Sequence, residues 1–332
     1  MFRILAAASF AMLATAGQLA TAAAPAPVPF RIGITAPTVN MLPIWMARDA
    51  GLFRAHGLEA EIVVTDGGSR GLAEVGAGRL NEMTVGLSSV LDANSKGGDY
   101  RLVASGANTL SLGFFAAKGI SAAQLKGKPV GVSSFGSESD TAATFTLRRL
   151  GLARTDVTMV ETGGTEKRLE LLKAGTIAAS ALNAPVNFMA TRDGLPKLVD
   201  LANDVPWIFT GMVFSTNYIA SNRAAVKNFL KAYVEGIHLA LSDEARAKAT
   251  LAREFKNLTP AILQDTYDDF KLRVPRDATP SRQGAGSMIR ELAAQGLRLK
   301  STSIADYIDF SLLEELRSEG FFEATQAKYR VP

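Results

Sequence analysis

Apolar residues in this chain come in short runs, and the runs alternate with segments in which apolar positions recur at helical spacing. A short apolar run bounded by glycine, proline, serine or aspartate is typical of a buried strand. Such runs predict strands at residues 30–34, 61–65, 83–87, 130–132, 157–160 and 179–182. Strands that alternate with helices through short connections predict a parallel sheet covered by helices on both faces, so the expected fold class is α/β.

The alternation runs twice along the chain. In the first round a helix ends at Gly78 and a strand then leads into Ser88, and in the second round a helix ends at Gly175 and a strand leads into Asn183. Glycine often ends a helix because it adopts the left-handed conformation without strain. Two matching rounds predict two similar α/β domains.

The chain from residue 213 onward is mostly helical by its pattern. Amphipathic segments occur at residues 224–241, 243–255 and 304–318. Such helices bury one apolar face, and we expect them to pack back on the first domain rather than to build a third core. The first domain is therefore expected to be discontinuous.

These expectations define the domain boundaries. Domain I is expected to comprise residues 30–115 and 214–332, and domain II residues 116–213. The chain then crosses between the domains twice, near residues 112–117 and 210–215. Two crossings between compact domains form a hinge.

The first residues have the layout of a secretory signal peptide. Arg3 precedes an apolar stretch at residues 4–16, and small residues follow up to Ala20 and Ala22. The apolar stretch is shorter than the ~20 residues that a membrane-spanning helix needs. We expect residues 1–22 to be a signal peptide that directs the protein to the periplasm. The sequence contains no cysteine, so a lipoprotein anchor, disulfides and thiol catalysis are not expected.

Charge and histidine content narrow the function classes. The formal net charge is +4, and the 36 lysines and arginines are scattered rather than gathered in a stripe, so nucleic acid is not an expected partner. The two histidines, His56 and His238, have no metal-ligand spacing. No phosphate-binding loop, nucleophile elbow or dinucleotide-binding motif occurs in a fitting context. We expect no metal, no cofactor and no enzymatic activity.

Several short motifs follow one another in a characteristic order. They are PIWMA at residues 43–47, GLF at 51–53, GL at 57–58, DGGS at 66–69, LKGKPVGV at 125–132 and the segment 222–233. In this order and spacing the chain resembles the solute-binding proteins of the nitrate, sulfonate and taurine (NitT/TauT) class of ABC importers. The resemblance spans nearly the whole chain after the leader. It implies a type II periplasmic-binding-protein fold, with two α/β domains around a ligand cleft.

The resemblance also implies a function. It implies a monomeric solute-binding component that delivers a small molecule to an ABC permease in the inner membrane, which works with a cytoplasmic ATPase. Proteins of the class usually have aspartate where Asn81 and Ala178 stand here, so the solute stays open among a sulfonate, nitrate, a carboxylate and a thiamine-precursor-like compound. An exported ligand sensor is one alternative. An enzyme is another, because the fold also occurs in a pyrimidine synthase of thiamine biosynthesis and in dehydratase-like enzymes of menaquinone biosynthesis.

The expected ligand site lies beyond the carboxyl ends of the strands, where loops lead into helix N-termini with free backbone N–H groups. Such loops occur in both domains. The predicted ligand-binding residues are Thr35, Asn40, Trp45, Gly67, Gly68, Ser69, Ser88, Ser89, Ser134, Phe135, Gly136, Ser137, Gly164 and Asn183.

Several of these residues also have a purely structural interpretation. Ser137 with Asp140 three residues later fits a helix cap. Trp45 suits either core packing or stacking on a flat ligand. Arg70 is expected to point to solvent. The charge of the ligand stays open, because helix N-termini favour anions, whereas Asp66, Glu138 and Asp140 place carboxylates near the same ends, where they would repel an anion or recruit an amine.

Overall fold

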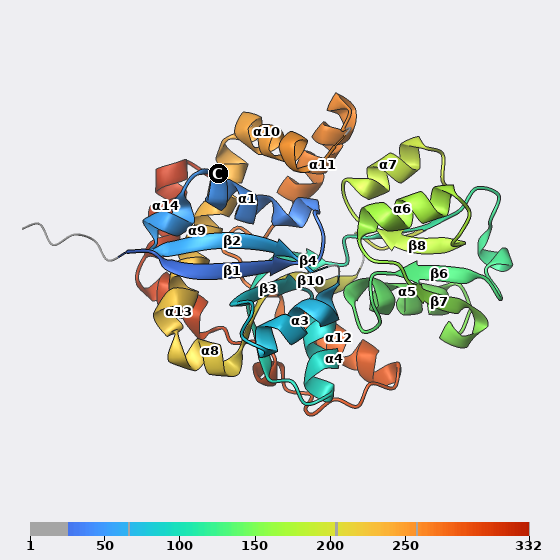
Figure 1. Cartoon of the computed structure of the whole chain (residues 1–332), viewed down its shortest axis with the longest axis horizontal. Coiled ribbons are helices and arrows are strands. Elements are labelled where there is room, and N and C mark those ends of the chain that lie inside the picture. The colour runs from blue at the N-terminus through green and yellow to red at the C-terminus, as the bar shows by residue number, and fades with distance from the viewer. Residues whose placement is uncertain (1–25, 66, 203–204, 257, 332) are drawn as a thin grey trace, which may run out of the picture.

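The computed structural model describes residues 26–65, 67–202, 205–256 and 258–331. The expected signal peptide, residues 1–22, lies outside the described residues, as does Asp66. The chain forms two sheets, each with its own helices, and these two halves lie side by side (Figure 1). We call the half that contains β1 the first lobe and the half that contains β6 the second lobe. The expected α/β class is confirmed.

The first sheet has five strands, and its parallel strands point their carboxyl ends toward the second lobe (Figure 1). β1 pairs in parallel with β2 and β3, whereas β10 runs antiparallel to both β3 and β4. In spatial order the strands are β2 (Leu58–Val64), β1 (Val28–Ile34), β3 (Glu82–Val85), β10 (Pro206–Ser215) and β4 (Tyr100–Thr109).

The second sheet repeats this arrangement. β6 pairs in parallel with β7 and β8, and β5 runs antiparallel to β8 and β9. In spatial order the strands are β7 (Thr158–Glu161), β6 (Pro129–Val132), β8 (Ala179–Leu182), β5 (Gly113–Ala116) and β9 (Lys197–Asp200). The two rounds in the sequence thus fold into two sheets of one topology.

The chain passes between the sheets at different residues than expected. It leaves the first sheet after Thr109, enters the second at Gly113, leaves it after Asp200 and returns at Pro206. The segment 210–215, expected to cross, lies within β10, and most of 112–117 forms β5. An antiparallel strand that follows a crossing has the same apolar pattern as the crossing itself. We therefore place the lobe boundaries at the two inter-sheet segments, rather than at residues 115 and 213.

Helices of the first lobe surround its sheet, and the helical region after β10 packs on this lobe (Figure 1). The longest helix, α9, packs against α1 and α2. The helices of the first lobe are α1 (Leu42–Asp49), α2 (Leu52–Ala55), α3 (Gly68–Gly76), α4 (Leu87–Ser95), α8 (Thr216–Ser221), α9 (Arg223–Ser242), α10 (Glu244–Glu254), α11 (Pro260–Arg273), α12 (Arg282–Ala294), α13 (Ser311–Ser318) and α14 (Phe321–Tyr329).

The second lobe is smaller. Its helices are α5 (Glu138–Arg149), α6 (Thr165–Lys173) and α7 (Val186–Arg192). The chain also has four short 3-10 helices among the described residues, namely η1 (Val39–Met41), η2 (Ala122–Gln124), η3 (Arg154–Asp156) and η4 (Ile304–Asp306). Within the part of the chain that the structure describes, no helix has the length and apolar character required to span a bilayer.

An aromatic cluster fills the core between the first sheet and α9. The ring of Phe229 stacks on Phe30 at a centroid distance of 5.5 Å and meets Phe214 edge-on at 5.7 Å. Trp45 belongs to the same core, where it is 1% exposed and meets Phe255 at 5.7 Å. Trp45 therefore packs inside the first lobe, and the expectation that it binds ligand does not fit its position.

Candidate functional site

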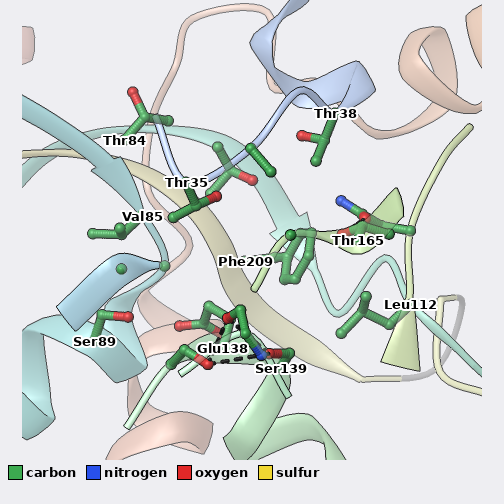
Figure 2. Close-up of a pocket in the computed structure, with 18 of the residues that line it drawn as sticks. Thr35, Thr38, Thr84, Val85, Ser89, Leu112, Glu138, Ser139, Thr165 and Phe209 are labelled. Carbon is green, nitrogen blue, oxygen red and sulfur yellow. Dashed lines mark hydrogen bonds between the residues drawn. The ribbon is translucent and has the colours of Figure 1, made fainter. Parts of the chain in front are cut away.

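A cavity of about 70 Å³ lies between the two lobes, at the carboxyl ends of the parallel strands of both sheets. Figure 2 shows side chains from both lobes around one space, with Thr35 and Ser89 from the first lobe and Glu138 and Thr165 from the second. Helix N-termini converge here because each parallel strand leads directly into a helix at this edge. The arrangement brings free backbone N–H groups and small polar side chains together.

Six of the fourteen predicted ligand-binding residues line this cavity. They stand just after a strand or in the cap or first turn of a helix, as the pattern of loops predicts. These residues are Thr35, Gly68, Ser89, Ser137, Gly164 and Asn183.

The other predicted residues lie nearby or elsewhere. Asn40 lies behind the wall, where its Nδ2 donates to Thr210 Oγ1 at 3.0 Å, and Thr210 lines the cavity. Gly67 faces Ser134 of the other lobe so closely that a Cβ at position 67 would lie 2.9 Å from Ser134 Oγ. Gly67 and Ser134 are therefore a contact between the lobes rather than part of the cavity wall.

Three more of the predicted residues line an outer groove of about 770 Å³ between α4, α5 and the end of α12. Ser88, Phe135 and Gly136 line this groove, and Phe135 is 48% exposed. Ser69 is beside it, where its hydroxyl donates to the Phe135 carbonyl at 3.0 Å. The turn at Gly136, with φ of 77°, directs Phe135 outward, so Phe135 forms no wall of the inner cavity.

Ser137 lies both at the cap of a helix and in the wall of the cavity. Its hydroxyl caps α5 by accepting from the Asp140 N–H at 3.4 Å, and it also lines the cavity. Ser133 Oγ donates to Ser137 Oγ at 2.9 Å and lies 3.0 Å from Ser139 Oγ. Three linked hydroxyl groups thus form the wall of the second lobe below the cavity.

Arg168, which the sequence analysis did not select, places a cation in the cavity wall. The side chain is 4% exposed and donates to Gly163 O at 2.6 Å, to Thr165 Oγ1 at 2.8 Å and to Ala181 O at 3.3 Å. Within the described residues, no carboxylate pairs with it. Burial lowers the pKa of the guanidinium to about 10, so the group stays charged at neutral pH. A buried cation bonded only to neutral groups attracts an anion.

A local signal for Arg168 exists in the sequence. The residue lies three positions after Thr165, the first residue of α6. Side chains of a helix lean toward its N-terminus, so an arginine in the first turns reaches back to the loop that leads into the helix. That loop, with Gly163 and Gly164, was already expected at the cleft.

Glu138, which the sequence analysis named for its charge and not as a site residue, joins the two lobes. It begins α5 in the second lobe, and its Oε1 accepts from the N–H of Ser88 in the first lobe at 2.7 Å. Its Oε2 accepts from Trp207 Nε1 at 2.7 Å. Burial raises the pKa of Glu138 to about 7, although hydrogen bonds from Ser88 and Trp207 act in the opposite direction.

Apolar side chains and one free hydroxyl complete the wall. Val85, Leu112 and Phe209 supply apolar surface, and Phe209 lies close to the middle of the view in Figure 2. Ser89 is 1% exposed, and among the residues that the structure describes its Oγ has no hydrogen-bond partner. A buried hydroxyl without a partner costs free energy unless a ligand or water meets it.

Comparison with known proteins identifies the family. Residues 38–247, more than half of the chain, match the family model described as NMT1/THI5 like. The chain therefore belongs to the NMT1/THI5-like family, and the resemblance to the NitT/TauT class is confirmed. No curated protein sequence matches the chain.

Solved structures share the fold at low sequence identity. The alkanesulfonate-binding protein SsuA from Xanthomonas axonopodis pv. citri, bound to MOPS, has a TM-score of 0.72 and 20% identity over 86% of this chain and 100% of its own. The periplasmic nitrate-binding protein NrtA from Synechocystis PCC 6803 has a TM-score of 0.64 and 10% identity, over 93% and 91% respectively. A mutant of DszB in complex with biphenyl-2-sulfinic acid shares the fold as well, with a TM-score of 0.61 and 16% identity, over 88% and 99%. The periplasmic-binding-protein fold is confirmed.

Proposed function

We propose that this protein is the solute-binding component of an ABC importer, and that it captures a small anion in the periplasm for a membrane permease. The proposal that the solute is an anion rests on Arg168, a buried cation in the cavity wall with no carboxylate partner in the described chain. Sulfonate- and nitrate-binding proteins share its fold, which supports an anion with several oxygen acceptors. Arginine binds such groups through two parallel N–H donors.

The size of the cavity limits the solute. A volume of about 70 Å³ holds about five to seven water-sized groups, at ~10–15 Å³ for each. Nitrate or a short sulfonate or carboxylate fits this range. A small solute with one anionic group is therefore the favoured ligand.

Contacts between the lobes support capture by closure. The Val39 N–H donates to Ala184 O at 3.1 Å, and Arg192 pairs with Asp265 at 2.8 Å on the surface. An anion that contacts both lobes adds to these contacts, so it shifts the equilibrium toward the closed arrangement. The closed arrangement is the one that we expect the permease to recognise.

A thermal-shift screen tests the proposal. The protein without residues 1–22 is melted alone and with nitrate, ethanesulfonate, acetate, an aromatic acid, a simple amine and a thiamine precursor. Ligand at 100 times its Kd adds roughly 2.7 kcal/mol to the free energy of unfolding. Stabilisation by anions, with the anion recovered unchanged, supports the proposal. Stabilisation by amines alone would contradict the proposal that the solute is an anion. Chemical conversion of a stabilising compound would favour an enzyme.

A further inference from the structure

The carboxyl group of Glu138 lies where an anion would bind to the first lobe. It accepts from the Ser88 N–H at the beginning of α4, a position that offers a free N–H and a partial positive charge. The group is packed so tightly against Gly86 that a Cβ there would lie 2.2 Å from Glu138 Cδ. The protein therefore supplies its own acid at this helix start, and Glu138 also lines the ligand cavity.

We propose that Glu138 makes anion capture proton-linked, so that the anion enters the cavity together with one proton that this carboxyl group holds. The inference rests on the proposed function. It concerns a residue that tunes binding and does not itself supply the positive charge for the anion. That charge comes from Arg168 in the second lobe.

The charges in the cavity explain the linkage. Arg168 and one bound anion neutralise each other, so an ionised Glu138 in the same cavity would leave a buried negative charge without a partner. Burying such a charge is costly, and the cost is largest where the wall is apolar. Val85, Leu112 and Phe209 make part of this wall apolar. Binding of the anion therefore favours the protonated form of Glu138.

The hydrogen bonds of Glu138 are compatible with a protonated carboxyl group. Its donors are the N–H groups of Ser88 and Ser89, the Ser88 hydroxyl and the Nε1–H of Trp207, all neutral. A protonated carboxyl group keeps acceptor capacity and gains one O–H donor. That donor can serve an oxygen of the anion in the cavity, which an ionised carboxylate would repel.

Other charged groups on the surrounding elements already have partners. On the two helices that meet at Glu138, the other carboxylates are Asp92 on α4, which accepts from Lys96 at 2.7 Å, and Asp140 on α5, which pairs with Arg154. On the adjoining elements, Glu82 on β3 accepts from Thr84 Oγ1 at 3.0 Å, and Glu291 on α12 pairs with Arg148 on α5 at 2.7 Å. The remaining arginines are Arg149, which lies over the ring of Phe145, Arg282, which lies over the ring of Phe310, and Arg290, which donates to Ser287 Oγ at 3.4 Å. β10 presents the neutral Trp207. Since burial raises the pKa of Glu138 to about 7, its proton exchanges close to neutral pH.

Calorimetry with nitrate and with ethanesulfonate tests the inference, because neither anion changes its own protonation between pH 5.5 and 9. Titrations in two buffers that differ in ionisation enthalpy count the protons bound with each anion. We expect uptake of roughly 0.8 proton per anion at pH 7.5 and about none at pH 5.5. The affinity should weaken by up to about tenfold per pH unit above pH 7.5. Proton uptake near zero at both pH values, with a constant affinity, would overturn the inference.

Two variants assign the proton to Glu138. Glu138→Gln keeps an oxygen acceptor but does not titrate, so its affinity should be independent of pH and proton uptake should vanish. Glu170→Gln removes the same charge from a site where the side chain is exposed and pairs with Lys167, and it should retain the wild-type pH dependence. Equal pH dependence in both variants would assign the proton to another group and overturn the inference.

A fluorescence titration separates this inference from the proposed function. Trp45 and Trp207 are the two tryptophans of the chain, so Trp45→Phe leaves Trp207 as the reporter beside Glu138. Without any anion, its emission should titrate with a midpoint near pH 7, and Glu138→Gln should abolish the titration. If emission titrates but no anion binds, the proposed function fails and the linkage fails with it. If anions bind but the emission does not titrate near neutral pH, only the inference fails.

Discussion

Two helices begin at the same cavity, α4 in the first lobe and α6 in the second. The charged side chains beside the two beginnings have opposite signs. At α4 the Ser88 N–H is satisfied by the protein's own acid, Glu138, which comes from the other lobe. At α6 the buried cation Arg168 lies beside the loop of its own helix, and its acceptors in the described part of the chain are all neutral. Both charged side chains therefore come from the second lobe: Arg168 stays beside its own helix, whereas Glu138 reaches across to the start of α4 in the first lobe.

Replacing the cation should have the largest effect. Arg168→Met should weaken binding of nitrate and ethanesulfonate by about 100-fold or more, because charge-assisted bonds in a buried site contribute about 2–5 kcal/mol. Titration calorimetry measures this loss. Lys167→Met is the control, since Lys167 is an exposed neighbour that pairs with Glu170 at 3.0 Å. Similar losses in both variants would mean that general charge, and not the cavity cation, attracts the anion.

A second buried acid, Glu82, sharpens the contrast with Glu138, because it lies within one lobe. It is 0% exposed and accepts from Thr84 Oγ1 at 3.0 Å. Burial raises the pKa of Glu82 well above its usual range, so the folded protein retains a proton that the unfolded chain has already released. Its contribution to stability therefore falls as pH rises above the pKa of the unfolded chain.

Glu82→Gln removes this dependence. Relative to the variant, the wild type should be less stable at pH 7.5 than at pH 6, with a slope of at most ~1.4 kcal/mol per pH unit. Urea denaturation at both pH values measures the difference. An unchanged difference between the two proteins would show that Glu82 has the same protonation in the folded and unfolded chains. Anion affinity should be unaffected, because Glu82 is not in the cavity wall.

Two buried hydroxyl groups, at Ser89 and Ser134, have no hydrogen-bond partner within the described ranges, and they form a matched pair across the lobes. Only Ser89 lines the cavity. Ser89→Ala should weaken anion binding by about three- to tenfold, the loss expected of one hydrogen bond, whereas Ser134→Ala should change it less than twofold. Equal effects in calorimetry would mean that the cavity wall does not define the contacts with the anion.

A single ion pair on the surface between the lobes should matter least. Arg192 and Asp265 pair at 2.8 Å, and their side chains are 46% and 45% exposed. Exposed ion pairs contribute about 0–1 kcal/mol, so Arg192→Ala should lower anion affinity by at most about fivefold. A loss as large as that of Arg168→Met would show that closure, rather than the cavity, limits binding.

Much of the fold could be predicted because apolar runs and helical spacing report burial directly. The parallel strands and the two rounds follow from such runs, and the order of motifs indicated the family. β10 was mistaken for a crossing, because a buried antiparallel strand and a buried connection share one apolar pattern. Only pairing with β3 and β4 distinguishes them, and that depends on the whole sheet.

The site could be predicted only where a loop alone determines it. Thr35, Gly164 and Asn183 follow strands, so topology brings them to the cavity. Trp45 was misassigned, because an apolar helix face does not reveal whether it meets a ligand or the core. Arg168 was missed, because the burial of a charged side chain depends on packing between α6 and β8 that spacing does not report.

A crystal structure with nitrate, and a second with ethanesulfonate, would show where the protein binds an anion. We predict one anion in the cavity between the lobes, with its oxygens accepting from Arg168 and from Ser89, and with Glu138 still bonded to Trp207. An anion bound only at the surface, or a cavity that holds water alone at saturating concentrations of both anions, would contradict the claim that this protein captures a small anion between its lobes.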